Sequence, residues 1–339
     1  MAKIFITGGA GFIGSHLADQ LMKIGEEVFV LDFFHQYIYP IQPTFIENMN
    51  YRFNKLLKGA EIVRGSTSNK DSLRRCINDI NPDYIVHLAA LPLANIALRQ
   101  PEEAFEGIVQ GTVNLLEIVR DLKNISKLVY VSSSMVYGDF KQIPMPEDGP
   151  KDPKEIYGGM KLSGELMVKV FSKRYGIPYA IVRPSAVYGP TDNNRRVLQI
   201  FVERALQKQP IEVLNPETLF LDFTYVEDIA QGLLKATMSA NALGEEFNIT
   251  RGVGHSLGEA VEILRRIFPE LEVSVKKKSD TYRPNRGSLD VAKARRLLDY
   301  NPQFDLENGL AKYVDYVRTY NLSLVEKSAQ SPSLSGSRN

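Results

Sequence analysis

Short apolar runs alternate with amphipathic segments along the first 185 residues of this 339-residue chain. The runs have the β-branched and aromatic character of buried strands, and the segments between them repeat apolar residues at helical spacing. Strand character is found at 3–6, 27–31, 61–64, 83–90, 127–131 and 179–184, and helical spacing at 13–24, 71–80, 101–120 and 157–175. Because strands that alternate with helices pair in parallel, this pattern predicts an α/β fold with a doubly wound parallel sheet.

The alternation becomes less regular after residue 185. Helical spacing is found at 196–208, 227–238 and 257–267, short strands are expected at 211–214 and 221–225, and segments 247–250, 290–298 and 306–320 complete the pattern. We therefore expect a larger domain at 1–185 and a smaller α+β substrate lobe at 186–321, a division that leaves room for the chain to cross back between the lobes. Residues 322–339 lose periodicity and fill with serine, which predicts a disordered tail.

An aromatic-rich insert at 33–59 separates the second strand from the third, and its residues 45–58 are expected to form a helix. A connection of this length is unusual in a compact α/β unit. Since aromatic side chains usually bury themselves, we favour a local mini-core under the insert over a substrate lid or a subunit contact.

The glycine-rich turn Thr7–Gly14 lies between the first strand and the first helix. Gly8 permits the tight turn, Gly11 lets the backbone approach a pyrophosphate, and Gly14 lets the helix pack close to the strand. Such a turn alone can simply join two elements, but Asp32 follows the second strand, where a carboxylate accepts hydrogen bonds from an adenosine ribose. The domain 1–185 is therefore predicted to be a Rossmann domain. Residues 33–35 contain no Arg for a 2′-phosphate, so NAD is favoured over NADP.

Composition adds mainly exclusions. The formal net charge of +1 gives no electrostatic reason to expect nucleic acid or an anionic membrane as a partner. Cys76 is the single cysteine and no Cys/His cluster has metal-ligand spacing, so neither an intrachain disulfide nor a metal site is expected. The first residues lead straight into a strand and no apolar run approaches membrane-spanning length, so we expect a soluble cytoplasmic protein.

A candidate catalytic constellation follows the fifth strand. Ser132, Ser133 and Ser134 stand at its carboxyl end, and Tyr157 and Lys161 share one face of the next helix because they lie four residues apart. Alone, such a Tyr–Lys pair usually marks a solvated helix edge. In a chain that already predicts NAD, a nearby ammonium would lower the pKa of the phenol and make it a base, while a serine hydroxyl positions the substrate hydroxyl.

These motifs, together with residues 87–90, Glu165 and residues 187–190, resemble the extended short-chain dehydrogenase/reductase family. More narrowly, the chain is similar to the NAD-dependent sugar-nucleotide epimerases and dehydratases. The resemblance implies that Ser133 is the catalytic Ser/Thr, that Tyr157 is the acid/base, and that Lys161 holds the nicotinamide ribose and depresses the tyrosine pKa. The expected cofactor contacts are Gly8, Gly11, Phe12, Ile13, Gly14, Asp32, Ser66, Leu88, Ala89, Ala90, Tyr157, Lys161 and Pro184.

The chain departs from the family pattern at three positions. Ser66 stands where relatives carry an Asp that contacts adenine, Ala186 replaces an Asn, and Leu221 replaces an Arg that clamps the substrate diphosphate. Arg286 matches a remaining phosphate-binding arginine. The expected substrate contacts are Ser133, Ser134, Arg195, Arg196 and Arg286.

Ser134 and Met135 stand where 4,6-dehydratases of the family carry an Asp-Glu pair, so dehydration is disfavoured. The expected function is epimerisation of a nucleotide sugar, at C4 through a 4-keto intermediate with transient hydride transfer. The alternatives are a dehydratase, decarboxylase or ketosugar reductase with the same site, or a non-catalytic NAD-binding protein. Relatives pair through the helices at 101–120 and 157–175, so we expect a homodimer in which Val109, Val113, Leu116 and Val119 supply apolar surface.

Overall fold

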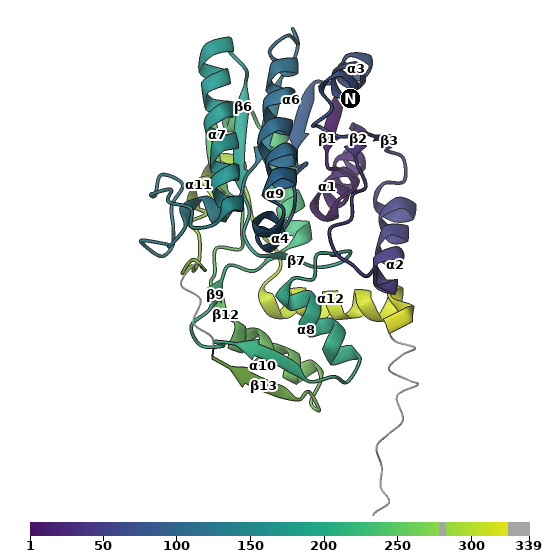
Figure 1. Cartoon of the computed structure of the whole chain (residues 1–339), viewed down its shortest axis with the longest axis vertical. Coiled ribbons are helices and arrows are strands. Elements are labelled where there is room, and N and C mark those ends of the chain that lie inside the picture. The colour runs from purple at the N-terminus through teal and green to yellow at the C-terminus, as the bar shows by residue number, and fades with distance from the viewer. Residues whose placement is uncertain (278–282, 325–339) are drawn as a thin grey trace, which may run out of the picture.

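A parallel sheet of seven strands, in the order β11-β6-β5-β4-β1-β2-β3, forms the larger lobe of the computed structural model, which describes residues 1–277 and 283–324 (Figure 1). Its strands are β1 (Lys3–Thr7), β2 (Glu27–Asp32), β3 (Glu61–Arg64), β4 (Tyr84–His87), β5 (Lys127–Val131), β6 (Tyr179–Arg183) and β11 (Glu245–Asn248). The predicted doubly wound α/β fold is confirmed.

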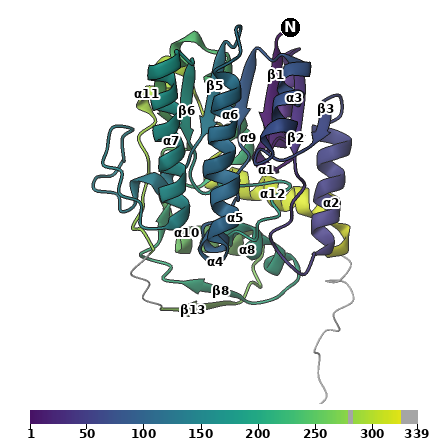
Figure 2. The same cartoon turned by 45° about the horizontal axis from the view of Figure 1, so that its top comes forward.

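The two faces of the sheet bury alternate residues of each strand. In β1, Ile4 and Ile6 belong to one hydrophobic cluster and Phe5 to another, since side chains of a strand point alternately to opposite faces. Helices α3 (Lys70–Ile80), α6 (Gly111–Val119) and α7 (Ile156–Tyr175) cover the face of Phe5, as Figure 2 shows, and α1 (Phe12–Lys23), α9 (Val226–Met238) and α11 (Ala292–Leu298) cover the other.

The chain reverses its winding direction between β1 and β4. From β1 it proceeds to β2 and β3 on one side, and then crosses back to β4, β5 and β6 on the other. The loops that follow β1 and β4 are therefore neighbours at the carboxyl edge of the sheet, because Thr7 pairs with His87. Such a reversal opens a crevice in which α/β proteins bind ligands.

The smaller lobe lies below this edge in Figure 1. It contains β8 (Ile211–Leu214) parallel to β13 (Val273–Lys276), β9 (Phe220–Leu221) antiparallel to β12 (His255–Ser256), and helices α8 (Val197–Leu206), α10 (Leu257–Ile267) and α12 (Leu306–Tyr320). A second short pair, β7 (Val187–Tyr188) with β10 (Thr224–Tyr225), connects it to the sheet. The lobe has its own core around Phe201, Leu264 and Val314.

The boundary expected at residue 185 does not separate the lobes, because the chain crosses back. β11 pairs with β6 in the main sheet, and α9 packs on α1. Sequence order alone does not say which sheet a later strand joins. At the other end, Ser323 hydrogen-bonds Glu47 and Leu324 is buried, so residues 323 and 324 pack on the rest of the protein although Leu322 is exposed. The rest of the tail prediction, 325–339, lies outside the described residues.

Two predicted elements differ in detail. The strand expected at 83–90 ends at His87, and residues 88–90 form a loop that is followed by a helix the sequence did not indicate, α4 (Ala94–Arg99). The helix expected at 101–120 comprises α5 (Pro101–Phe105), a π-helical turn at 106–110, and α6. No helix within 1–277 and 283–324 is both long and apolar enough to span a membrane.

The second half of the insert packs on the other lobe. Its helix α2 (Pro43–Tyr51) meets α12, where Asn48 Oδ1 accepts hydrogen bonds from the Tyr316 hydroxyl at 2.8 Å and from Asn321 Nδ2 at 3.0 Å. The Tyr51 ring lies edge-on to Tyr316, with 5.0 Å between the ring centroids. The mini-core interpretation is therefore wrong for this half, which joins the N-terminal domain to the last helix.

Candidate active site

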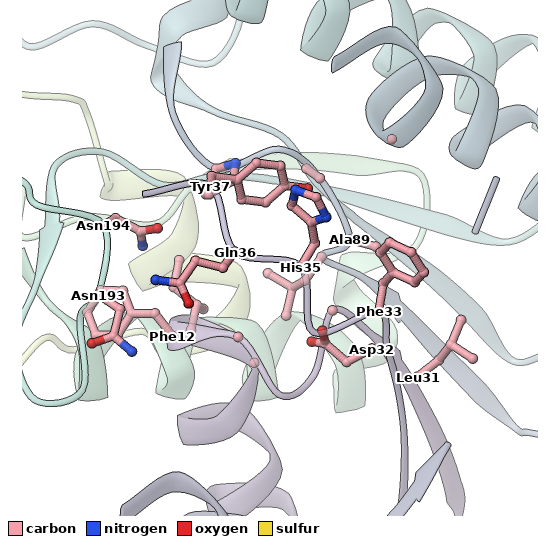
Figure 3. A pocket seen from close by; sticks show the side chains of 18 of the residues that line it. Phe12, Leu31, Asp32, Phe33, His35, Gln36, Tyr37, Ala89, Asn193 and Asn194 are labelled. Carbon is pink, nitrogen blue, oxygen red and sulfur yellow. The ribbon is translucent and has the colours of Figure 1, made fainter. Parts of the chain in front are cut away.

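The first cleft opens above the glycine turn (Figure 3). Helix α1 begins at Phe12 without a side-chain cap, so its first N–H groups face the cleft without a partner from a capping side chain. The turn is tight: a Cβ at Gly14 would lie 2.5 Å from the Gly8 carbonyl oxygen, so only glycine permits this contact. An uncapped helix N-terminus with backbone exposed at a glycine turn is a site for an anionic group such as a pyrophosphate.

Asp32 ends β2 at the rim of this cleft. Its carboxylate accepts hydrogen bonds from the Phe34 N–H at 2.8 Å and the Ala10 N–H at 3.1 Å, which fix it beside the glycine turn. Burial raises the pKa of the carboxyl, while these N–H groups and the charge of Arg52 act in the opposite direction. Figure 3 shows Asp32 below Phe33 and His35, whose segment crosses the cleft.

Every expected cofactor contact lines one of two adjoining clefts. Gly8, Gly11, Phe12, Ile13, Gly14, Asp32, Ser66, Leu88, Ala89 and Ala90 line the first, and Tyr157, Lys161 and Pro184 line the second. Ile13, Leu88, Ala90, Pro92 and Arg196 line both, so the clefts are continuous. Their contact with the cofactor stays a prediction.

Arg52 is a residue of the first cleft that the sequence did not indicate. It is buried, donates from Nη1 to the Ala10 carbonyl at 3.1 Å, and also hydrogen-bonds the Thr191 carbonyl. Burial lowers its pKa to about 10, against the attraction of Asp192 and Asp32. Arg52 therefore ties the glycine turn to the smaller lobe, which also contributes Asn193 and Asn194 to the cleft wall. Nothing in the local pattern of the insert distinguishes this arginine.

Ser133, Tyr157 and Lys161 meet in the second cleft. Ser133 follows β5 and caps a 3-10 turn at 134–137, accepting from the Met135 N–H at 3.2 Å, and it hydrogen-bonds the Tyr157 phenol. Lys161 is buried and donates to the Val131 carbonyl at 2.8 Å, with its Nζ 6.0 Å from the centre of the Tyr157 ring. Tyr157 stands in the first turn of α7, where the helix dipole favours an anion.

The surroundings of Tyr157 act on its pKa in both directions. Burial raises the pKa of the phenol, whereas the charge of Arg196 and the hydrogen bond with Ser133 lower it. Burial also lowers the pKa of Lys161, to about 8. The ammonium of Lys161 is thus desolvated and is held in place by its hydrogen bond to the Val131 carbonyl. The expected effect of Lys161 on the tyrosine pKa stays a prediction.

The expected substrate contacts divide into two groups. Arg286 and Arg196 line the second cleft, as does Ser134, although the Ser134 hydroxyl is buried and donates to Ser185 Oγ at 3.0 Å. Arg195 lines neither cleft, because its backbone has φ 55° and its side chain forms an ion pair with Glu203 instead.

Arg286 is the arginine of the second cleft that has an unsatisfied buried polar atom. Its Nε is buried without a hydrogen-bond partner, and burial next to Arg283 lowers its pKa to about 10. By contrast, the described residues contain no group of three or more His, Cys, Asp or Glu side chains that could hold a metal ion.

A doubly wound fold whose dinucleotide cleft joins a Ser–Tyr–Lys site defines a protein of the short-chain dehydrogenase/reductase class. Within this class the chain belongs to the NAD dependent epimerase/dehydratase family, whose model matches residues 4–250.

Several relatives are named as UDP-sugar 4-epimerases. The chain is 29% identical to UDP-glucuronate 4-epimerase 4 of Arabidopsis thaliana, over 94% of this chain and 75% of that protein. The crystal structure of UDP-glucuronic acid 4-epimerase from Bacillus cereus, in complex with UDP-glucuronic acid and NAD, is similar with a TM-score of 0.84 and 30% identity, covering 94% of this chain and 99% of that one. The structure of UDP-glucose 4-epimerase of Thermotoga maritima with UDP-glucose is similar with a TM-score of 0.83 and 28% sequence identity. The match covers 94% of this chain and 99% of that one.

Proposed function

We propose that the protein is an NAD-dependent nucleotide-sugar 4-epimerase, an isomerase acting on a uridine diphosphate sugar. The observation that carries this proposal is the composition of the second cleft: it holds Ser133, Tyr157 and Lys161, and none of its described lining residues is an Asp or Glu. A dehydratase needs a carboxyl group to protonate the leaving hydroxyl. The described lining of this cleft therefore contains Tyr157 as a base for a sugar hydroxyl, but no carboxyl group that could protonate a leaving hydroxyl.

NAD, the cofactor of the family, fits the first cleft, where the glycine turn and the start of α1 would hold its pyrophosphate and Asp32 its adenosine ribose. Bound there, it would accept and return a hydride. Ser133 orients the C4 hydroxyl of the sugar, and Tyr157 takes its proton as the C4–H bond breaks and a 4-keto sugar forms. After the keto sugar turns in the cleft, Tyr157 would return the proton to the oxygen on C4. Because bound NAD would accept and return the same hydride, the reaction would consume no net NAD.

An assay on intact protein tests this proposal. We expect interconversion of UDP-glucose with UDP-galactose, or of UDP-glucuronate with UDP-galacturonate, without a change in product mass and without net NADH. A product lighter by water or carbon dioxide would instead assign a dehydratase or decarboxylase, and net NADH would assign an oxidoreductase. Inactivity on both pairs and on dTDP-glucose, with NAD still bound, would favour the non-catalytic NAD-binding alternative.

A homodimer formed through α5, α6 and α7 is a further proposal. Exposed apolar side chains on these helices support it: Phe105 is 51% exposed, Leu166 52% and Val170 57%. Of the residues expected to supply this surface, Leu116 and Val119 are buried against the sheet instead. We expect a dimer in sedimentation at micromolar concentration and a monomer for Leu166→Glu with Val170→Glu. A monomeric wild type contradicts the proposal. The cytoplasmic location stays a prediction.

A further inference from the structure

Asp222 is a buried carboxylate that lies directly behind the wall of the second cleft. Its neighbours in the chain, Leu221 and Phe223, both line this cleft, whereas the Asp222 side chain is fully buried. Burial raises the pKa of its carboxyl to about 7, and hydrogen bonds from its neighbours act in the opposite direction. A carboxylate taken out of water in this way depends on the groups that donate to it.

The donors to Asp222 come from two segments that are distant from each other in the chain. From the first segment, the Thr250 hydroxyl donates to Oδ2 at 2.8 Å and the Gly252 N–H donates to Oδ1 at 3.1 Å. From the second, the Leu289 N–H donates to Oδ2 at 3.0 Å. The carboxylate therefore bridges the two segments, and both of its oxygens are used.

The second of these segments follows Arg286, whose side chain lines the second cleft. Met145 pairs with one edge of this segment, where its carbonyl accepts from the Asp290 N–H at 2.8 Å. Because successive N–H groups of an extended chain point to opposite sides, the Leu289 N–H points away from Met145 and meets Asp222. Asp222 thus holds the edge that Met145 leaves unpaired.

The guanidinium of Arg286 depends on this backbone for its placement. Its Nε is buried and has no hydrogen-bond partner within the part of the chain that the structure describes. A contact that fixes the backbone three residues further on therefore also restricts where the guanidinium lies in the cleft.

We infer that Asp222 is a positioning residue for substrate binding: by bridging Gly252 and Leu289, it fixes the segment of Arg286 against the cleft wall formed by Leu221 and Phe223. Asp222 acts on the substrate through Arg286 and does not touch it. The inference rests on the proposed function, since it needs an anionic nucleotide sugar as the ligand of Arg286.

Asp228 provides a matched control for this role. It is also a buried carboxylate that accepts from the backbone of a distant segment, through the Gln303 N–H at 2.7 Å and the Phe304 N–H at 3.0 Å. Unlike Asp222, it has no neighbour in the chain that lines either cleft. Loss of its charge should therefore affect stability without affecting the substrate.

The test is Asp222→Asn, which preserves the size of the side chain but offers one acceptor oxygen in place of two. Whichever way the amide turns, its NH2 group faces the N–H of Leu289 or of Gly252, so the bridge is broken. We expect the KM for the UDP-sugar, and the Kd of UDP measured by calorimetry, to rise by about three- to tenfold with kcat less changed. Asp222→Ala, which removes both acceptors, should have the larger effect.

Asp228→Asn should lower the melting temperature but leave KM and the Kd of UDP unchanged. A double-mutant cycle with Arg286→Met then shows whether Asp222 acts through Arg286. In the Arg286→Met background, Asp222→Asn should raise the Kd of UDP by less than about twofold, because the group that it positions is already absent.

An unchanged KM and Kd in folded Asp222→Asn would overturn the inference, and this variant decides the question if Asp222→Ala does not fold. An undiminished effect in the Arg286→Met background, or an equal effect of Asp228→Asn, would also overturn it. A wild-type protein that binds UDP through Asp222 but converts no nucleotide sugar would refute only the proposed function. A wild-type protein that binds no UDP would overturn both.

Discussion

The two adjoining clefts are built in different ways. The floor of the first cleft is backbone: the glycine turn, the start of α1 and the loop after β4 form it, and two N–H groups place Asp32 beside it. The second cleft is formed by side chains from separate segments, including Ser133, Tyr157, Arg196 and Arg286. Backbone geometry binds what all members of the family share, whereas side chains on loops and helix ends set the chemistry and the substrate.

The largest effect is expected from Tyr157→Phe, which removes the acid/base but none of the backbone that forms the first cleft. We expect kcat to fall by about 10³-fold or more, while NAD remains bound. Epimerisation rates and the mass of nucleotide released on denaturation measure the two properties separately. Tyr175→Phe, at the exposed end of the same helix, is the control. Joint loss of NAD and turnover would show that the clefts are not independent.

Gly14→Val should weaken NAD binding in the first cleft, whereas it leaves the side chains of the second cleft in place. Its Cβ would lie 2.5 Å from the Gly8 carbonyl oxygen and 2.6 Å from Gly9 Cα, so the turn must separate from α1. We expect NAD affinity to fall by about 10- to 100-fold, as overpacking of about 1–3 kcal/mol implies. Gly159→Ala is the control, since no atom lies within 4 Å of the added Cβ. Normal NAD binding by Gly14→Val in calorimetry would contradict this account of the turn.

The same difference explains what the sequence could reveal. The glycine turn and Asp32 were recognised because a backbone site uses neighbouring residues in a fixed order. Arg52 was missed because its partners, Ala10 and Thr191, are distant in the chain. Arg195 and Arg196 could not be separated, since only the left-handed backbone at Arg195 turns their side chains apart. The sequence does not say which lobe β11 joins, because pairing with β6 is a tertiary property.

Arg286→Met should weaken substrate binding without loss of stability. The unpaired Nε and the pKa lowered by burial, against the attraction of Glu155, indicate a desolvated guanidinium, which an anionic ligand such as a diphosphate would stabilise. We expect KM to rise by about tenfold with kcat less changed, and the melting temperature of the ligand-free protein to stay equal or rise. A lower melting temperature with an unchanged KM would make Arg286 a structural residue.

The smallest effect is expected from alkaline pH, where the loss of activity tests whether the Lys161 ammonium is required. Its folded-state pKa of about 8 lies below the usual value near 10.5, so the ammonium loses its proton as pH rises through about 8. We expect activity to halve near pH 8 and to fall further by pH 9, and Lys161→Arg to have a lower activity without this decline, because guanidinium does not titrate there.

The titration of Lys161 does not itself destabilise the fold over this pH range. Between about pH 8 and 10.5 the unfolded chain holds the Lys161 proton and the folded chain does not, so the contribution of Lys161 to the free energy of unfolding grows as pH rises. Activity should therefore fall while this contribution to stability increases. Equilibrium unfolding in denaturant at pH 7.5 and 9.5, for wild type and Lys161→Arg, measures the second quantity. A wild-type activity that is constant to pH 10 would show that the Lys161 ammonium is not required.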